Sequence, residues 1–245
     1  MSVRLTFVGS GDAFAGGGRF NTCLHLEADG TEPLLLDCGA SSLIALKRLS
    51  IDPASIGHVA LTHLHGDHFG GLPWLILDGQ FASRTKPLEI LGPPKTRERF
   101  DQLLDVLYPG AREAERAFPT IVSEYTERPQ TFGPARITAY PVIHTPQTMP
   151  HGLRVEYAGK VIAYSGDTEW TDTLIELSAK ADLFVCECNF FDKKAPGHLD
   201  YETLAARRPQ LECERLVITH MNQDVLARAD ELELEAATDG AVISV

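Results

Sequence analysis

Three histidines and one aspartate lie within six residues of each other, in the segment Leu61-Thr62-His63-Leu64-His65-Gly66-Asp67-His68. The segment follows an apolar stretch that is typical of a strand. Because residues two apart in an extended chain point to the same side, His63 and His65 can bind one cation together. Asp67 and His68 come after the turn at Gly66 and can face a second cation. Imidazole and carboxylate ligands favour zinc, with manganese or iron as alternatives.

The same four side chains would have a simpler role in a hydrogen-bonded polar loop, or in a helix whose N-terminus is capped by Asp67. A stretch in which four of six residues are able to bind a metal is unusual for a loop without one. The spacing therefore predicts a metal site here.

The composition limits the classes of partner. The chain of 245 residues carries 34 acidic and 22 basic side chains, a formal net charge of −12. A field of that sign repels polyanions and argues against nucleic-acid or anionic-membrane binding, although bound cations would still admit a small anionic substrate. The five cysteines have no framework spacing, and no apolar run reaches the length of a membrane span. We expect a soluble, cytoplasmic protein without a disulfide scaffold, and we leave a homodimer open.

Strand-like and helix-like segments alternate along the chain, without internal repeats or linkers. Apolar patterning predicts helices at 41–49, 72–76, 100–107, 170–179 and 201–206, with a further short helix after 219. It predicts strands at 4–8, 23–27, 34–37, 59–62, 88–91, 121–125, 136–143, 153–157, 161–164, 183–188, 216–219 and 241–245. This alternation indicates two packed sheets covered by helices in one domain, residues 1–245.

The segment Thr62-His63-Leu64-His65-Gly66-Asp67-His68-Phe69-Gly70-Gly71 resembles the HxHxDH signature of the metallo-β-lactamase superfamily, and the resemblance extends over nearly the whole chain. It implies an α/β (α+β) fold, the four-layered αββα sandwich, with two divalent metal ions at one edge of the sheets. The resemblance also implies three further ligands, each after an apolar strand: His144 for the first metal, Asp167 as the bridging carboxylate and His220 for the second metal. His151 is the rival of His144 and is interpreted as a neighbour of the site. Asp167 has the alternative role of capping the helix predicted at 170–179.

Other segments are similar to the tRNase Z-like phosphodiesterase branch of that superfamily. They are Gly9-Ser10-Gly11, Leu36-Asp37-Cys38-Gly39, and Glu187-Cys188-Asn189-Phe190-Phe191 followed by Gly197-His198-Leu199-Asp200. The resemblance implies that His198 gives a proton to the leaving group, that Glu187 orients it, and that Asp67 belongs to the catalytic set. A metal-bridging hydroxide would attack the phosphorus atom.

One departure from that branch bears on the substrate. A tRNase Z carries a long tRNA-gripping arm between the third ligand and the bridging aspartate, whereas only residues 145–166 separate His144 from Asp167 here. With the acidic charge, this favours a small phosphodiester substrate, including cyclic ones, over tRNA 3′ processing. The main alternative is a thioester or lactone hydrolase on the same scaffold, in which His198 would have no obvious task.

Two further classes fit the sequence less well. An iron-dependent oxygen or nitric-oxide reductase of this superfamily would place a glutamate at His65 and add a flavin domain. A metal-free binding module is disfavoured because all seven ligand positions are filled. Arg19 and Arg208 are interpreted as surface charges, and Cys186 and Cys188 as buried apolar side chains.

Overall fold

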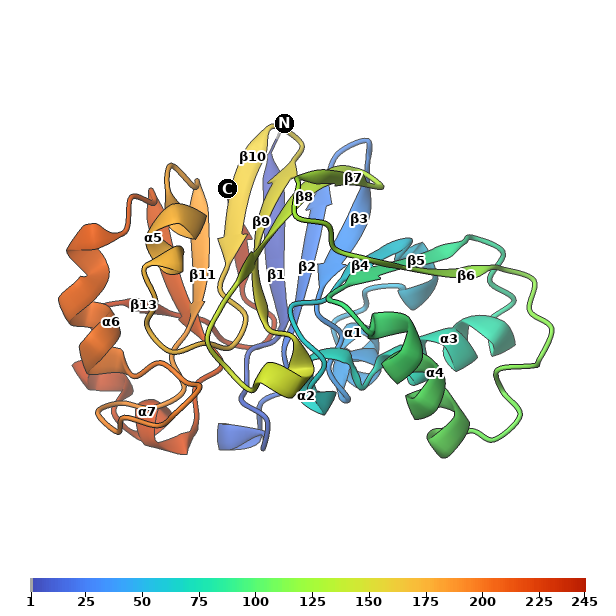
Figure 1. Ribbon diagram of the computed structural model, residues 1–245, viewed down its shortest axis with the longest axis horizontal. Coiled ribbons are helices and arrows are strands. Elements are labelled where there is room, and N and C mark those ends of the chain that lie inside the picture. The colour runs from blue at the N-terminus through green and yellow to red at the C-terminus, as the bar shows by residue number, and fades with distance from the viewer. Residues whose placement is uncertain (1) are drawn as a thin grey trace.

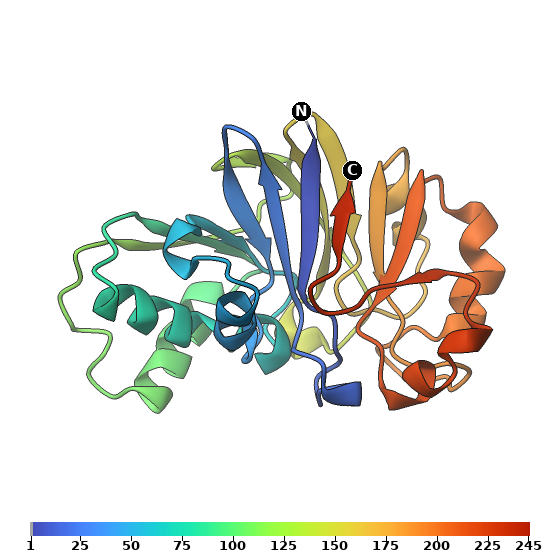
Figure 2. The same cartoon turned by 180° about the vertical axis from the view of Figure 1, so that it is seen from behind.

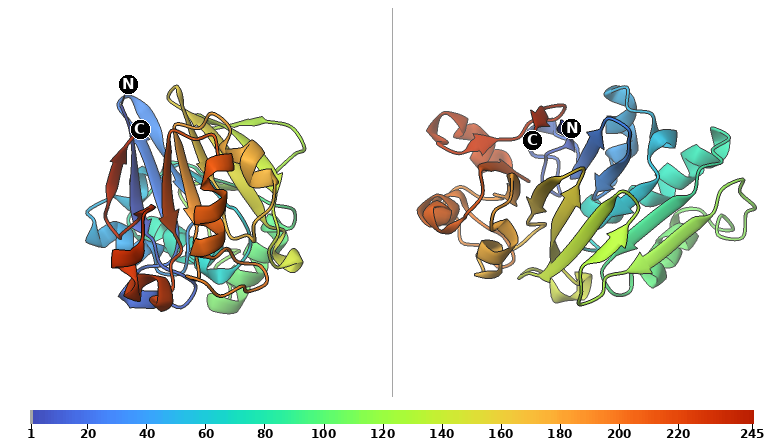
Figure 3. Two further views of the ribbon diagram at one scale, coloured as in Figure 1. Left: turned by 90° about the vertical axis from the view of Figure 1, so that its left-hand side faces the viewer. Right: turned by 90° about the horizontal axis from the view of Figure 1, so that it is seen from above.

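The computed structural model describes residues 2–245 as two seven-stranded sheets that pack face to face, with helices on both outer faces (Figure 1). The strand order is β14-β1-β2-β3-β4-β5-β6 in the first sheet and β13-β12-β11-β10-β9-β8-β7 in the second. Viewed from above, the two sheets lie between their helical layers (Figure 3). The predicted four-layered αββα sandwich of the α/β class is confirmed.

The first half of the chain builds most of the first sheet and the helices that cover it. Strands β1 to β3 pair antiparallel, and β3 to β6 pair parallel. The strands are β1 (Val3–Gly9), β2 (Cys23–Ala28), β3 (Thr31–Leu36), β4 (His58–Ala60), β5 (Leu88–Gly92) and β6 (Thr120–Glu124). The helices are α1 (Ser42–Arg48), α2 (Gly66–Phe69), α3 (Leu72–Phe81) and α4 (Thr96–Leu107), with 3-10 turns at Gly16–Gly18 and Pro53–Ser55.

The second half builds the second sheet. Strands β7 to β10 form an antiparallel meander, and β10 to β13 pair parallel. The strands are β7 (Gln130–Phe132), β8 (Ala135–Pro141), β9 (His151–Tyr157), β10 (Lys160–Tyr164), β11 (Leu183–Glu187), β12 (Arg215–Thr219) and β13 (Glu235–Ala236). The helices are α5 (Thr173–Ser178), α6 (Tyr201–Arg207) and α7 (Gln223–Ala227), with 3-10 turns at Pro146–Thr148, Arg208–Gln210 and Ala229–Glu231. The last strand, β14 (Val242–Ser244), returns to pair with β1 (Figure 2).

Continuous apolar runs mark the strands that are buried on both faces. In β3, Leu34 and Leu36 pack into the core between the two sheets, while Leu35 packs with Leu46 of α1 in the outer layer. The core between the sheets draws side chains from both halves, such as Phe7 and Val155. Because the two sheets share this core, we infer that residues 2–245 form a single domain.

The differences from the predicted elements are at boundaries and in very short segments. The helix predicted at 170–179 begins only at Thr173 and has Asp172 at its N-cap position, so Asp167 does not cap it. Likewise, Asp67 is not the cap of α2, whose N-cap residue is His65. Strands β7 and β13 and helix α2 were not predicted because two to four residues carry too little periodicity. Within residues 2–245, no helix combines the length and the apolar character needed to cross a bilayer.

Candidate metal centre

The seven predicted ligands lie on loops and on the short helix α2, in segments that follow the ends of strands. His63 and His65 follow β4, and Asp67 and His68 belong to the short helix α2. Each of the other three follows the end of a strand: His144 comes after β8, Asp167 after β10 and His220 after β12. Loops at one sheet edge can bring ligands distant in sequence together on a rigid scaffold.

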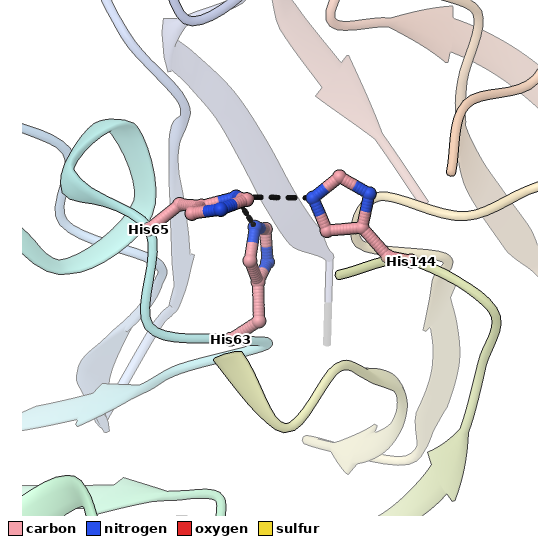
Figure 4. Close-up of side chains that lie close together, drawn as sticks. All are labelled: His63, His65 and His144. Carbon is pink, nitrogen blue, oxygen red and sulfur yellow. Dashed lines mark hydrogen bonds between the residues drawn. The ribbon is translucent and has the colours of Figure 1, made fainter. Parts of the chain in front are cut away.

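Three of these residues, His63, His65 and His144, form what we call the three-histidine cluster. The Nδ1 atom of His65 lies 3.2 Å from Nε2 of His63 and 3.0 Å from Nε2 of His144 (Figure 4). Three ring nitrogens that converge in this way form a donor set that zinc prefers.

The other four residues, Asp67, His68, Asp167 and His220, form what we call the mixed cluster, whose ligand atoms lie within 4.8 Å of one another. Nε2 of His220 lies 3.2 Å from Oδ2 of Asp67 and 3.3 Å from Oδ2 of Asp167. The same Asp167 oxygen is 3.8 Å from Nε2 of His63 and 3.9 Å from Nε2 of His144. The Asp167 carboxylate therefore lies between the two clusters, where a bridging ligand would have to be.

Some buried polar atoms of the clusters make no hydrogen bond within the clusters and are suited to bind a cation. Nε2 of His68 and Oδ1 of Asp167 are buried 3.2 Å apart, and among residues 2–245 neither atom has a partner in hydrogen-bond geometry. An unsatisfied buried polar atom costs about 1–3 kcal/mol, a cost that a metal ion between the two atoms would remove.

The pKa values point the same way. Burial lowers the pKa of His63 and lowers the pKa of His144 to about 4, which keeps these imidazoles in the neutral form that binds metals. Burial alone would also lower the pKa of His220, but the neighbouring Asp167 and Asp67 carboxylates raise it to about 9. The carboxylates of the mixed cluster thus favour positive charge at this place, as a site for a divalent cation would.

The second ring nitrogens of the ligands have partners that hold the rings in place. Nδ1 of His68 lies 2.7 Å from Oδ2 of Asp37, Nδ1 of His144 donates to the carbonyl oxygen of Gly197 at 2.6 Å, and Nδ1 of His63 lies 3.1 Å from Oγ1 of Thr62. Such partners fix the tautomer and turn the other nitrogen toward the metal.

Asp37 contacts the predicted ligand His68, although the sequence indicated no role for it. The available signal was its place directly after an apolar strand, in the segment Leu36-Asp37-Cys38-Gly39.

Both Asp37 (φ 61°) and His220 (φ 58°) adopt the left-handed backbone conformation. For residues other than glycine this conformation is strained, and such strain concentrates at functional sites. A Cβ atom on Gly39 would lie 2.1 Å from the carbonyl oxygen of Asp67, so only glycine lets this loop approach α2.

His198 and Glu187 lie together beside the clusters. Nδ1 of His198 is 3.3 Å from both carboxylate oxygens of Glu187, and the His198 ring centroid is 4.8 Å from that of His144. The Glu187 carboxylate, which is buried, also accepts hydrogen bonds from the backbone N–H groups of Thr168 and Leu199. Burial alone would lower the pKa of His198, but the hydrogen bond and charge of Glu187 raise it. The pair can therefore hold a proton next to the metal centre.

The remaining candidates lie apart from the two clusters. His151 donates from Nδ1 to the carbonyl oxygen of Met149 at 2.8 Å and is in neither cluster. Cys186 and Cys188 pack into the buried core beneath α5 to α7. Arg19 donates to the carbonyl oxygen of Ala237, and Arg208 to that of Leu211.

This fold and this edge site define a class, the hydrolases with the metallo-β-lactamase fold. A sequence model of the family described as anti-Pycsar protein Apyc1 matches residues 3–237, and the chain belongs to that family. The chain is 32% identical to the uncharacterized protein Rv1339 of Mycobacterium tuberculosis, over 100% of this chain and 90% of that protein. It is 30% identical to a ribonuclease Z of Mycobacterium marinum, over 97% of this chain and 93% of that protein.

A solved structure has the same fold. The metallo-β-lactamase fold protein YhfI from Bacillus subtilis superposes with a TM-score of 0.80 at 24% identity, and the match covers 100% of both chains. The predicted superfamily and the predicted hydrolase class are confirmed, and they imply that the chain binds divalent metal.

Proposed function

We propose that this protein is a dinuclear metal-dependent phosphodiesterase that acts on a small phosphodiester, including cyclic ones. The observation that carries the proposal is the His198–Glu187 pair beside the two clusters, with His198 3.3 Å from the Glu187 carboxylate. Cleavage of a phosphodiester releases an alkoxide, which needs a proton, and a positioned imidazole can provide one.

The seven ligands would divide between two cations. The three-histidine cluster would hold one, and Asp67, His68 and His220 would hold the other, with Asp167 shared between them. Zinc suits these donors best, with manganese or iron as alternatives. When bound, the cations would neutralise the charge of the phosphate and lower the pKa of a water molecule.

Protein side chains would then direct the proton. The Glu187 carboxylate accepts a hydrogen bond from Nδ1 of His198. Nε2 of the same ring is then free to carry a second proton. The oxygen of a water molecule adds to the phosphorus atom and the water gives up a proton to solvent. The bond from phosphorus to the leaving oxygen breaks, the proton on Nε2 passes to that oxygen, and His198 regains a proton from solvent. The products are a phosphomonoester and an alcohol, which remain joined in one molecule when the substrate is cyclic.

The surroundings of His198 suit a small leaving group. A cavity of about 340 Å³ lies beside His198 and is also lined by Trp170, Lys194 and Thr203. Between His144 and Asp167 the chain forms only a 3-10 turn and the β9–β10 hairpin. These features, with the net charge of −12, support a small substrate rather than a folded RNA.

A second candidate function, nucleic-acid cleavage, is favoured by one observation, the ribonuclease Z name of a relative 30% identical over 97% of this chain. Thioester or lactone hydrolysis remains an alternative from the sequence, but it gives the His198–Glu187 pair no task.

The experiment that tests the proposal is a substrate panel. The purified protein, loaded with zinc or manganese, would be assayed on chromogenic phosphodiesters, cyclic phosphodiesters, thioesters, lactones and precursor tRNA. Turnover confined to small phosphodiesters is expected. Faster turnover of an acyl substrate or of tRNA would replace the proposal with the corresponding alternative.

A further inference from the structure

A ring of hydrogen bonds links three loops next to the metal clusters, and the Glu169 carboxylate closes it. Oε1 of Glu169 accepts from the backbone N–H of Gly197 at 2.7 Å. The carbonyl oxygen of Gly197 accepts from Nδ1 of His144 at 2.6 Å. The backbone N–H of Glu169 donates to the carbonyl oxygen of Ile143 at 2.8 Å, and Ile143 directly precedes His144. The ring therefore connects the loops that carry Asp167, His144 and His198.

Gly197 is the junction of this ring. It is buried, and its backbone has a left-handed conformation with φ 82°. A Cβ atom there would lie 2.9 Å from Nδ1 of His144, so the backbone itself is in contact with the ligand. A buried N–H group needs a partner, and Glu169 supplies it. Without that partner, the N–H of Gly197 would be buried and unsatisfied, and a shift of the loop that relieved this would disturb the contact of the Gly197 carbonyl with His144.

We propose that Glu169 is a positioning residue for both His144 and His198. By holding the N–H of Gly197, it directs the Gly197 carbonyl at Nδ1 of His144 and so keeps Nε2 turned toward the three-histidine cluster. It also sets the place of His198, which follows Gly197 in the chain. The part that concerns His198 rests on the proposed function, whereas the part that concerns His144 requires only that the cluster binds metal.

The first measurement is metal affinity, which needs no substrate. Competition with a chelating dye would give the zinc affinity of the wild type, Glu169→Ala, Glu169→Gln and the control Glu176→Gln, whose side chain is exposed on α5. We expect Glu169→Ala to bind zinc about 10- to 100-fold more weakly, the usual cost of removing a partner behind a metal ligand. Glu169→Gln should bind nearly as well as the wild type, because its amide oxygen can still accept from Gly197.

The cobalt-loaded proteins add a spectroscopic readout. The visible absorption of Co²⁺ responds to its ligand geometry, so it should change in Glu169→Ala and return to the wild-type form in Glu169→Gln. Glu169→Met keeps the length of the side chain but cannot accept a hydrogen bond from Gly197, so it should weaken zinc binding as Glu169→Ala does. This second variant keeps the proposal testable if Glu169→Ala does not fold.

Several outcomes would overturn the proposal. They are unchanged zinc affinity and cobalt spectrum in Glu169→Ala, a Gln variant as defective as the Ala variant, or a lower Tm of the metal-free protein without a change in affinity. If the protein cleaves phosphodiesters, Glu169→Ala saturated with zinc should also lose kcat while KM stays nearly constant. A protein that cleaves none but shows the expected zinc affinities would refute the proposed function and leave the role of Glu169 toward His144 intact.

Discussion

Oδ2 of Asp37 lies 2.7 Å from Nδ1 of His68, and neither side chain has any exposed surface. The same oxygen accepts from the hydroxyl of Tyr164 at 3.0 Å, while Oδ1 accepts from the backbone N–H of Thr62 at 2.7 Å. The Asp37 carboxylate is therefore held by residues of α2, of β10 and of the loop after β4. It keeps a proton on Nδ1 of His68 and leaves Nε2 for the mixed cluster.

Replacing this carboxylate should weaken metal binding without removing a ligand. We expect Asp37→Asn to lower the affinity of the mixed cluster for zinc by about 10- to 100-fold, because the amide cannot stabilise the His68 tautomer as the carboxylate does. Competition titrations with a chelating dye would measure this. Asp29→Asn, in the exposed turn after β2, is the matched control. Equal affinities for Asp37→Asn and wild type would contradict the role given to Asp37.

Metal analysis of the purified protein should find about two divalent ions per chain, because seven ligands suffice for two cations. His63→Ala and Asp67→Ala should lose metal together with activity. His151→Ala removes a nearby histidine that lies in neither cluster, so it should keep both ions. A protein that stays free of metal after incubation with zinc and with manganese would refute the whole assignment.

The proton-donor role separates His198 from the ligands. His198→Ala should keep both metals and yet cleave phosphodiesters about 10²- to 10⁴-fold more slowly, the usual contribution of a general acid. The loss should shrink for a nitrophenolate leaving group, which departs without a proton. Steady-state kinetics on two esters with different leaving groups would measure this.

Glu187→Gln is the companion variant for that experiment. It should show a milder form of the same defect, because the amide still contacts His198 but no longer stabilises its charged form. If His198→Ala lost a metal, His198 would be a ligand. If His198→Ala cleaved substrates with poor leaving groups as fast as the wild type, thioester or lactone hydrolysis would become the favoured function.

Binding to tRNA should be weak. The net charge of −12 opposes the approach of a polyanion, and between His144 and Asp167 the chain forms only a short hairpin and a 3-10 turn. Filter binding at physiological salt should therefore detect no nanomolar complex with precursor tRNA. Tight binding with correct 3′ cleavage would instead place the protein with the ribonuclease Z relatives in function.

We expect the burial of His25 to make the protein less stable in mild acid. The His25 side chain on β2 is buried, and neither ring nitrogen has a hydrogen-bond partner in the part of the chain that the structure describes. Burial lowers its pKa below 6.5, and the opposing effect of Glu27 does not reverse this. Between the folded-state pKa and 6.5 the unfolded chain binds more protons, so the free energy of unfolding should fall as the pH drops below about 6.5.

The His25→Gln variant isolates this effect. Urea unfolding of the wild type and of His25→Gln at about pH 7.5 and about pH 5 should show a larger loss of stability for the wild type, because glutamine does not titrate. Parallel losses in the two proteins would show that His25 is not the group responsible.

The sequence alone was enough to predict the layered fold and the positions of most strands. A short apolar run between turn residues, such as Leu34-Leu35-Leu36, is typical of a strand buried on both faces. The density of His63, His65, Asp67 and His68 also indicated metal chemistry without a structure, because few other arrangements use those residue types at that spacing. Helix α2 and strands β7 and β13 could not be predicted from the sequence. Such short elements are stabilised by tertiary contacts and show no recognisable periodicity.

Only the tertiary structure decided how the distant residues act together. Proximity of His144, Asp167 and His220 depends on how three separate strands end at one sheet edge, and His151 has the same local chemistry as His144 but lies apart from the clusters. The partners Asp37, Gly197 and Glu169 act through hydrogen bonds between residues far apart in the chain, such as Tyr164 and Asp37, which are 127 residues apart, and Gly197 and His144, which are 53 residues apart. Backbone groups and common side chains form these bonds, and they leave no pattern in the sequence. Only the folded structure shows which of them are paired.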